Sequence, residues 1–191
     1  MALERIVIVG KSGAGKTTLA TQLADRLNLT NVELDGISWQ ANWVNLPKHE
    51  MRERVDEALP VAGHWVADGN YVRSVRDIVW VRADTLIWLD YSLRVALLRV
   101  LRRTTARIVR RKKLWNGNRE TLRHYLSFDP SQNLFLSTIR MHKRHRNDFP
   151  ALFEQPEYGH LNVLWFRTSK ETEQWLRGLQ NTKELGKKIV E

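Results

Sequence analysis

The most informative segment of this sequence is Gly10-Lys11-Ser12-Gly13-Ala14-Gly15-Lys16-Thr17. It satisfies the pattern G-x-x-x-x-G-K-[ST] in full. A continuous β-branched run at 6–9 precedes it and predicts a strand buried on both faces. Apolar residues at helical spacing follow it and predict a helix over 17–27. A strand, a glycine-rich turn and a helix in this order are typical of a phosphate-binding loop, or P-loop.

The residue types in this loop explain how it would hold a phosphate chain. Glycines let successive backbone N–H groups turn inward around an anion, and the following helix adds its unpaired N–H groups and the positive end of its dipole. Lys16 would bring a charge to the β and γ phosphates, and Thr17 would offer its hydroxyl to Mg²⁺. The alternative is a glycine-rich turn that binds no ligand. The predicted nucleotide-binding residues here are Gly10, Ser12, Gly13, Ala14, Gly15, Lys16, Thr17 and Thr18.

The rest of the sequence alternates strands and helices. Short apolar segments predict four more strands, at 32–34, 64–67, 85–89 and 162–166. Helical spacing of apolar residues predicts further helices at 48–59, 93–113, 119–126, 134–146 and 171–179. Strands separated by helices form parallel sheets that are covered on both faces, so the predicted fold class is α/β.

Length and composition are those of an ordinary single-domain globular protein. The chain has 191 residues, of which 42% are hydrophobic and 27% are charged, and it contains no cysteine. The lack of cysteine excludes disulfides, thiolate metal sites and a cysteine nucleophile, and it is typical of a reducing compartment. The longest apolar runs have strand length, far below the roughly 20 residues of a membrane helix. We expect one domain over 1–180, a polar tail over 181–191, no membrane contact and a cytoplasmic location.

The positive charge of the chain is concentrated in one segment. With 31 basic and 21 acidic residues, the formal net charge is +10. Residues 91–119 contain ten basic residues and no acidic one, which accounts for the whole excess. Such a segment favours a phosphate-bearing partner, either a small molecule or a nucleic acid.

Three carboxylates follow predicted strands. Ligands of an open parallel sheet gather at the carboxyl ends of its strands, and Asp35, Asp68 and Asp90 fall at such ends. Asp68 is the candidate for orienting Mg²⁺ together with Thr17, and its alternative is the turn chemistry of an Asp-Gly pair. Asp35 would contact the acceptor or act as a base, and its alternative is a helix cap or an Asx turn. For Asp90, helix capping and catalysis are equally open.

Arginines of the basic segment would supply the charge that phosphoryl transfer needs. The protein must hold two polyanions in line and neutralise charge on the transferred group. Residues three and four apart share a helix face, which groups Arg99, Arg102 and Arg103 and extends to Arg107. The alternative is a solvated basic face. We expect two or three of the arginines between 94 and 111 to reach phosphate, with Arg103 and Arg107 as the candidates.

Further motifs accompany the loop. They are Leu34-Asp35 followed by Trp39 and Trp43, Asp68-Gly69-Asn70-Tyr71, residues 82–90, Arg99 with Arg102-Arg103, and residues 114–120. Together they resemble the P-loop nucleoside-monophosphate-kinase group, and within it the adenylate-kinase-like proteins often labelled "topology modulation protein". The resemblance implies a three-layer fold with a five-stranded parallel sheet of order 2-3-1-4-5, ATP as donor, Mg²⁺, and an arginine-bearing lid. We place this helical lid region at about 104–146.

The acceptor site is predicted from position and from this resemblance. Arg73 and Arg76 follow the Asp-Gly pair at a distance that suits a clamp on an acceptor phosphate. Trp39 and Trp43 lie where an acceptor would enter, and they would either stack on a base or pack in the core. Adenylate kinases place Pro-Arg soon after a similar Asp-Gly, whereas this chain has Asn-Tyr-Val-Arg at 70–73, so the acceptor stays open. The predicted acceptor-binding residues are Asp35, Trp39, Trp43, Arg73 and Arg76.

The function expected from the sequence is an ATP- and Mg²⁺-dependent kinase that phosphorylates a small acceptor, with a nucleotide favoured. One alternative is a nucleic-acid-associated NTP binder or polynucleotide-type kinase that uses 91–119. Another is a regulatory nucleotide-binding protein without turnover. The predicted catalytic residues are Lys16, Asp68, Asp35, Arg103 and Arg107; Arg103 would also bind the nucleotide, and Thr17 and Asp68 the metal.

Overall fold

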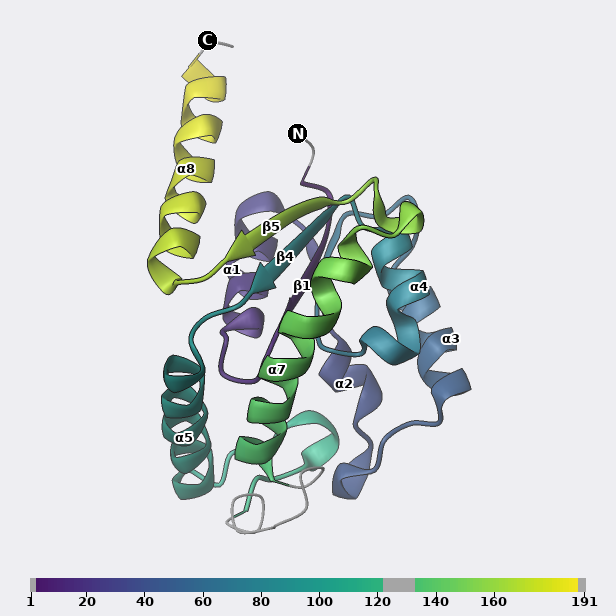
Figure 1. Ribbon diagram of the computed structural model, residues 1–191, viewed down its shortest axis with the longest axis vertical. Helices are drawn as coiled ribbons and strands as arrows, with labels where there is room; N and C mark the ends of the chain where they lie inside the picture. Colours follow the sequence, from purple (N-terminus) through teal and green to yellow (C-terminus); the bar gives the residue numbers. More distant parts are fainter. Residues whose placement is uncertain (1–2, 122–132, 189–191) are drawn as a thin grey trace.

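Figure 1 shows the architecture of the computed structural model, which describes residues 3–121 and 133–188. One five-stranded sheet has the order β2-β3-β1-β4-β5, and every neighbouring pair is parallel. The α/β class and the strand order implied by the resemblance are therefore confirmed. The strands are β1 (Arg5–Gly10), β2 (Thr30–Glu33), β3 (Trp65–Asp68), β4 (Thr85–Leu89) and β5 (Asn162–Phe166).

Helices connect the strands and cover both faces of the sheet (Figure 1). They are α1 (Lys16–Leu27), α2 (Leu34–Ser38), α3 (Lys48–Ala58), α4 (Val72–Arg82), α5 (Leu93–Val109), α7 (Leu134–Phe153) and α8 (Ser169–Lys188). Short 3-10 helices lie at Ala41–Trp43, Trp115–Gly117 and Pro156–Tyr158. Among the helices described, none is both long and apolar enough to cross a membrane.

Several helices differ from the prediction. The helices α2 and α4 were missed. Leu34, predicted to end a strand, begins α2. The buried residues Val75 and Val79 of α4 are four apart, as on one helix face. The helix α5 ends at Val109 rather than at 113, and Arg111 just beyond it has a left-handed backbone with φ of 46°. The helices α7 and α8 extend beyond their predicted ends, and α7 continues through Pro150. Of the helix predicted at 119–126, only 119–121 belong to the described residues, and these are not helical.

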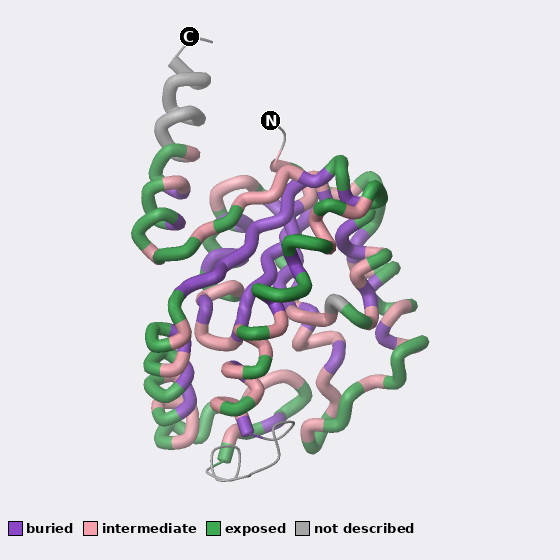
Figure 2. The backbone as a smooth tube through the Cα atoms, in the orientation of Figure 1, coloured by how far each residue is buried: buried purple, intermediate pink, exposed green. Residues whose placement is uncertain are grey.

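The alternation of side chains along β1 explains the three layers. Val7 and Val9 point to one face, where their core cluster includes residues of α3, α4 and α7. Ile6 and Ile8 point to the other face, where theirs includes residues of α1 and α8. All four are at most 1% exposed, and Figure 2 shows the central strands as buried along their length. Because helices cover both faces, ligands can reach this sheet only at the ends of its strands. The glycine-rich loop lies at the carboxyl ends, which we call the carboxyl edge.

Candidate active site

The glycine-rich loop joins β1 to α1 with a backbone that requires glycine. Gly13 and Gly15 have φ of 76° and 95°, in the left-handed region. A Cβ on Gly13 would collide with the carbonyl oxygen of Ala96, so this glycine also lets α5 pack against the loop. Within the described residues, no side chain caps the N-terminus of α1. The N–H groups of its first turn are therefore available to an anionic ligand.

The loop borders a cavity of about 1610 Å³ at the carboxyl edge of the sheet. This first cavity brings together many of the predicted site residues, whereas Gly10 is buried and does not line it. It also includes residues that the sequence analysis did not select for the site, among them Glu33, Tyr71, Arg99 and Glu120. The predicted residues that line it are Ser12, Gly13, Ala14, Gly15, Lys16, Thr17, Thr18, Asp35, Trp39, Trp43, Arg103 and Arg107.

The two predicted metal ligands, Thr17 and Asp68, are in direct contact. The hydroxyl of Thr17 donates a hydrogen bond of 2.7 Å to Oδ2 of Asp68. Asp68 is only 4% exposed and does not line the cavity, whereas Thr17 does. Burial raises the pKa of Asp68, although the hydrogen bond from Thr17 and the charge of Lys16 oppose this. Its second oxygen, Oδ1, has no hydrogen-bond partner among the residues that the structure describes.

Asp35 and Lys16 lie close to this pair. Burial lowers the pKa of Lys16, while the charges of Asp35 and Asp68 oppose the shift. The hydroxyl of Tyr71 donates a hydrogen bond of 2.8 Å to Oδ1 of Asp35, and burial together with this carboxylate raises the pKa of Tyr71. The helix-cap alternative for Asp35 is wrong, because Glu33 occupies the N-cap of α2.

Three arginines at intervals of four residues on α5 line the first cavity: Arg99, Arg103 and Arg107. Arg107 forms an ion pair of 2.7 Å with Glu120, whose carboxylate is mostly buried. The Arg99 guanidinium lies over the ring of Tyr91 at 5.3 Å, and its Nη2 donates a hydrogen bond of 2.7 Å to the Ser169 hydroxyl. Nη1 of Arg99 also donates to the carbonyl oxygen of Ala14 at 3.5 Å, so this part of the basic segment reaches the glycine-rich loop.

The turn after α5 closes over the segment that follows α2. Trp39 and Trp43 contact each other edge to face at 5.4 Å. The backbone N–H of Trp43 donates to Oδ1 of Asn118 at 2.9 Å, and Asn118 Nδ2 donates to the Gln40 carbonyl at 2.7 Å. Trp115 contacts the other end of α2, donating from Nε1 to Glu33 at 2.9 Å. Residues 115–118 thus hold the two tryptophans at the edge of the first cavity.

Arg73 and Arg76 are separated from the other predicted acceptor residues. They line a second cavity of about 1230 Å³, between α3, α4 and α7. The Arg76 guanidinium lies over the rings of Trp80 and Tyr158, at 5.9 and 5.3 Å. The two cavities adjoin, because they share the lining residues Asn70, Ser137 and Met141.

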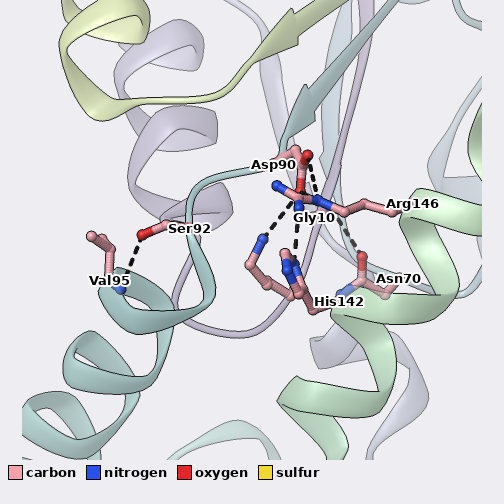
Figure 3. Close-up of polar contacts among 8 residues, drawn as sticks. Gly10, Asn70, Asp90, Ser92, Val95, His142 and Arg146 are labelled. Carbon is pink, nitrogen blue, oxygen red and sulfur yellow. Dashed lines mark hydrogen bonds and ion pairs between the residues drawn. The ribbon is translucent and has the colours of Figure 1, made fainter.

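Asp90 forms a buried charge cluster that the sequence analysis did not foresee (Figure 3). Its carboxylate contacts Lys11 and Arg146. Of the two roles left open for Asp90, helix capping is wrong, because the hydroxyl of Ser92 caps α5 by accepting from the N–H of Val95. No local signal identifies this cluster, since its members are 56 and 79 residues apart in sequence.

Comparisons with known proteins agree with this description. The family described as "ATPase family associated with various cellular activities (AAA)" matches residues 6–67, which include the glycine-rich loop. A search among curated proteins gave no match. Three solved structures share the fold at low sequence identity, as follows.

A gluconokinase from Sinorhizobium meliloti 1021 has a TM-score of 0.52 and 15% identity, over 98% of this chain and 96% of that chain. The shikimate kinase from Acinetobacter baumannii in complex with shikimate has a TM-score of 0.53 and 17% identity, over 96% of both chains. The shikimate kinase from Bacteroides thetaiotaomicron has a TM-score of 0.50 and 16% identity, over 96% of this chain and 99% of that chain. The chain therefore has the α/β P-loop NTPase fold, and its structural neighbours are kinases.

Proposed function

We propose that this protein is an ATP- and Mg²⁺-dependent kinase that transfers the γ-phosphoryl group of ATP to a small-molecule acceptor. The observation that carries the proposal is the contact between Thr17 and Asp68 beside Lys16, at the start of the helix that follows the loop. A hydroxyl and a carboxylate at this position suit a nucleotide-bound metal ion, and the lysine suits the phosphate chain. The structural neighbours include a gluconokinase and a shikimate kinase, which supports a small-molecule acceptor.

The donors at this position fit Mg²⁺. This ion prefers oxygen ligands and usually takes only one or two from the protein, with the rest from phosphate and water. Oδ1 of Asp68 is buried and without a hydrogen-bond partner among the described residues, and Thr17 supplies a hydroxyl oxygen. No group of three or more His, Cys, Asp or Glu side chains suited to a metal occurs in the described part of the chain. When bound, Mg²⁺ would neutralise charge on the β and γ phosphates.

The chain's own residues would orient and neutralise the reactants. In the proposed reaction an acceptor oxygen forms a bond to the γ phosphorus. The bond from that phosphorus to the β–γ bridging oxygen breaks, and ADP leaves with the electron pair. Lys16, Arg103 and Arg107 would neutralise charge on the transferred group. A hydroxyl acceptor would also lose one proton, and Asp35 is the candidate base, held by its hydrogen bond from Tyr71.

We favour a nucleotide as the acceptor, in line with the resemblance to adenylate-kinase-like topology modulation proteins. Trp39 and Trp43 line the first cavity and offer aromatic surface to a base. Lys48, Arg73 and Arg140 line the second cavity and have no acidic partner within ion-pair distance among the described residues. These cations would hold an anionic group of the acceptor, such as its phosphate.

An ADP-release screen tests the proposal. Nucleoside monophosphates, small alcohols, sugars, hydroxy acids and 5′-hydroxyl oligonucleotides would each be offered with Mg·ATP. The Lys16→Ala variant controls for contaminating activity, and its rate should fall to background. Stimulation by a small acceptor, little changed between 50 and 200 mM salt, is the expected result. Stimulation only by oligonucleotides, lost over the same salt range, would favour a polynucleotide-type kinase that uses 91–119. No stimulation by any acceptor would favour a regulatory nucleotide-binding protein.

A further inference from the structure

The second residue of the glycine-rich loop, Lys11, points away from the cavity into a buried ion pair. Its Nζ lies 3.3 Å from Oδ1 of Asp90, and the two side chains are only 2% and 3% exposed. Arg146 of α7 approaches the same carboxylate, with Nε at 2.9 Å from Oδ2 and 3.1 Å from Oδ1. Figure 3 shows Arg146 and His142 reaching from α7 toward Asp90, which follows β4.

Asp90 is the single acid in this contact group, whereas its neighbours are basic. His142 lies with Nδ1 3.8 Å from Oδ1 of Asp90. Burial and the charges of Lys11 and Arg146 lower the pKa of His142, which favours its neutral imidazole over a third cation. Two cations therefore share one carboxylate. A buried cation that loses its partner is strongly disfavoured, so Asp90 fixes the position of Lys11 and with it the start of the loop.

A second contact ties the loop to the same helix. The backbone N–H of Gly10 donates a hydrogen bond of 3.1 Å to Oδ1 of Asn70. Nδ2 of Asn70 in turn lies 3.0 Å from Sδ of Met141. Met141 belongs to α7, a little more than one helical turn before Arg146. Gly10 and Lys11 are thus each connected to α7 through one intermediate side chain, Asn70 for the first and Asp90 for the second.

Arg146 lies outside the chemistry of the site. It lines neither the first nor the second cavity. Its side chain is 49% exposed, so its replacement leaves no fully buried gap. Arg146 is therefore not placed to touch a bound nucleotide, and its ion pair with Asp90 connects it to Lys11 and the start of the loop.

We propose that Asp90 is a positioning residue for the phosphate-binding loop, acting through Lys11 and held in place by Arg146 of α7. This inference rests on the proposed function, because it concerns the affinity of the loop for a nucleotide. The P-loop motif gives none of these three residues a role. Its second position, here Lys11, can be any residue, and Asp90 and Arg146 lie outside it.

Calorimetric titration with Mg·ADP tests this inference on the full-length protein. Arg146→Gln should weaken Mg·ADP binding about tenfold, the loss expected when about 1.4 kcal/mol of a charge-assisted contact is removed. The matched control is Lys143→Gln, which removes an exposed cation of the same helix and should leave the Kd within about twofold. Thermal unfolding of each variant separates affinity from stability, because a merely structural role would lower the melting temperature and leave the Kd of the folded protein unchanged.

A variant cycle then tests the route through Asp90. Asp90→Asn alone leaves two cations without their carboxylate and is expected to destabilise the fold. The cycle therefore uses the double variant Lys11→Met with Asp90→Asn as its background. Arg146→Gln should have no further effect on the Kd there, whereas an undiminished tenfold effect would overturn the inference.

Failure of this inference and failure of the proposed function give different results. If the wild type binds Mg·ADP and Arg146→Gln binds it equally well, the inference alone is wrong. If the wild type releases no heat with Mg·ADP, both the proposed function and the inference are wrong.

Discussion

Thr17 in α1 and Asp68 at the end of β3 are joined by a hydrogen bond of 2.7 Å although 51 residues separate them in the sequence. The strand order brings them together, because β3 pairs with β1 so that Asp68 lies opposite Ile8, just before the glycine-rich loop. A parallel sheet in this order delivers a carboxylate to the first turn of the phosphate-binding helix. This pair is the basis of the proposed chemistry.

Replacing Asp68 by asparagine should separate activity from stability. Asp68→Asn is expected to lower kcat about 100-fold, because the variant loses the charge that would balance the metal. Burial raises the pKa of Asp68, which means that the folded protein disfavours the ionised carboxylate. At pH values above that raised pKa, the ionised carboxylate therefore lowers the free energy of unfolding. The neutral amide of asparagine carries no charge and does not have this effect. Urea unfolding at pH 7 should therefore show the variant to be at least as stable as the wild type.

The control for this prediction is Asp25→Asn, at an exposed position of α1. It should change neither kcat nor the free energy of unfolding appreciably. Full activity of Asp68→Asn would show that Asp68 has no part in the reaction.

His145 should make the protein sensitive to acid. It is 6% exposed and stacks on Phe149 at 4.3 Å, and its burial lowers its pKa to about 3. The unfolded chain binds a proton near pH 6.5, so the stability contributed by the neutral form is complete above that pH and is lost as the pH falls toward 3. Between pH 8 and pH 5 the loss should be about 2 kcal/mol of unfolding free energy.

Urea unfolding at several pH values checks this prediction, with His145→Gln as the comparison. The variant should be less stable at pH 8 and should lose less stability on acidification. An equal pH dependence in both proteins would show that the acid sensitivity comes from other groups.

The turn at 115–118 should control acceptor entry rather than nucleotide binding. Asn118 is 4% exposed. Its side-chain amide donates hydrogen bonds to the carbonyls of Gln40 and Trp115 and accepts one from the backbone N–H of Trp43. Asn118→Ala removes these bonds and should raise the acceptor KM about tenfold, while the Kd of Mg·ADP stays within about twofold. Asn147→Ala, at an exposed position of α7, is the control. A change confined to nucleotide affinity would contradict this assignment.

Cations of the second cavity should discriminate acceptors by charge. Arg140→Gln is expected to raise the KM of an anionic acceptor about tenfold and to leave that of a neutral analogue with the same scaffold unchanged. Steady-state kinetics with matched pairs, such as a nucleoside and its monophosphate, measure the difference. The exposed Arg94 of α5 supplies the control variant Arg94→Gln. Equal effects on both members of a pair would place the acceptor's anionic group elsewhere.

The parts of the fold that depend on local pattern could be predicted from sequence. The strands at 85–89 and 162–166 have the bounds expected from their apolar runs, and the loop between strand and helix follows from its glycines and Lys16. Partners that meet only through the tertiary fold could not be predicted. The sequence places Arg73 soon after Asp68, but α4 directs it to the second cavity, and nothing near Lys11 points to Asp90 or Arg146.

The central claim is that the loop from Gly10 to Thr17 binds the phosphate chain of ATP. Calorimetric titration of the wild type with Mg·ATP, side by side with Lys16→Ala, measures this directly. The account predicts saturable heat for the wild type and at least about tenfold weaker binding for Lys16→Ala, since the variant loses a charge next to the phosphates. No heat with the wild type, or an equal Kd for the two proteins, would contradict it.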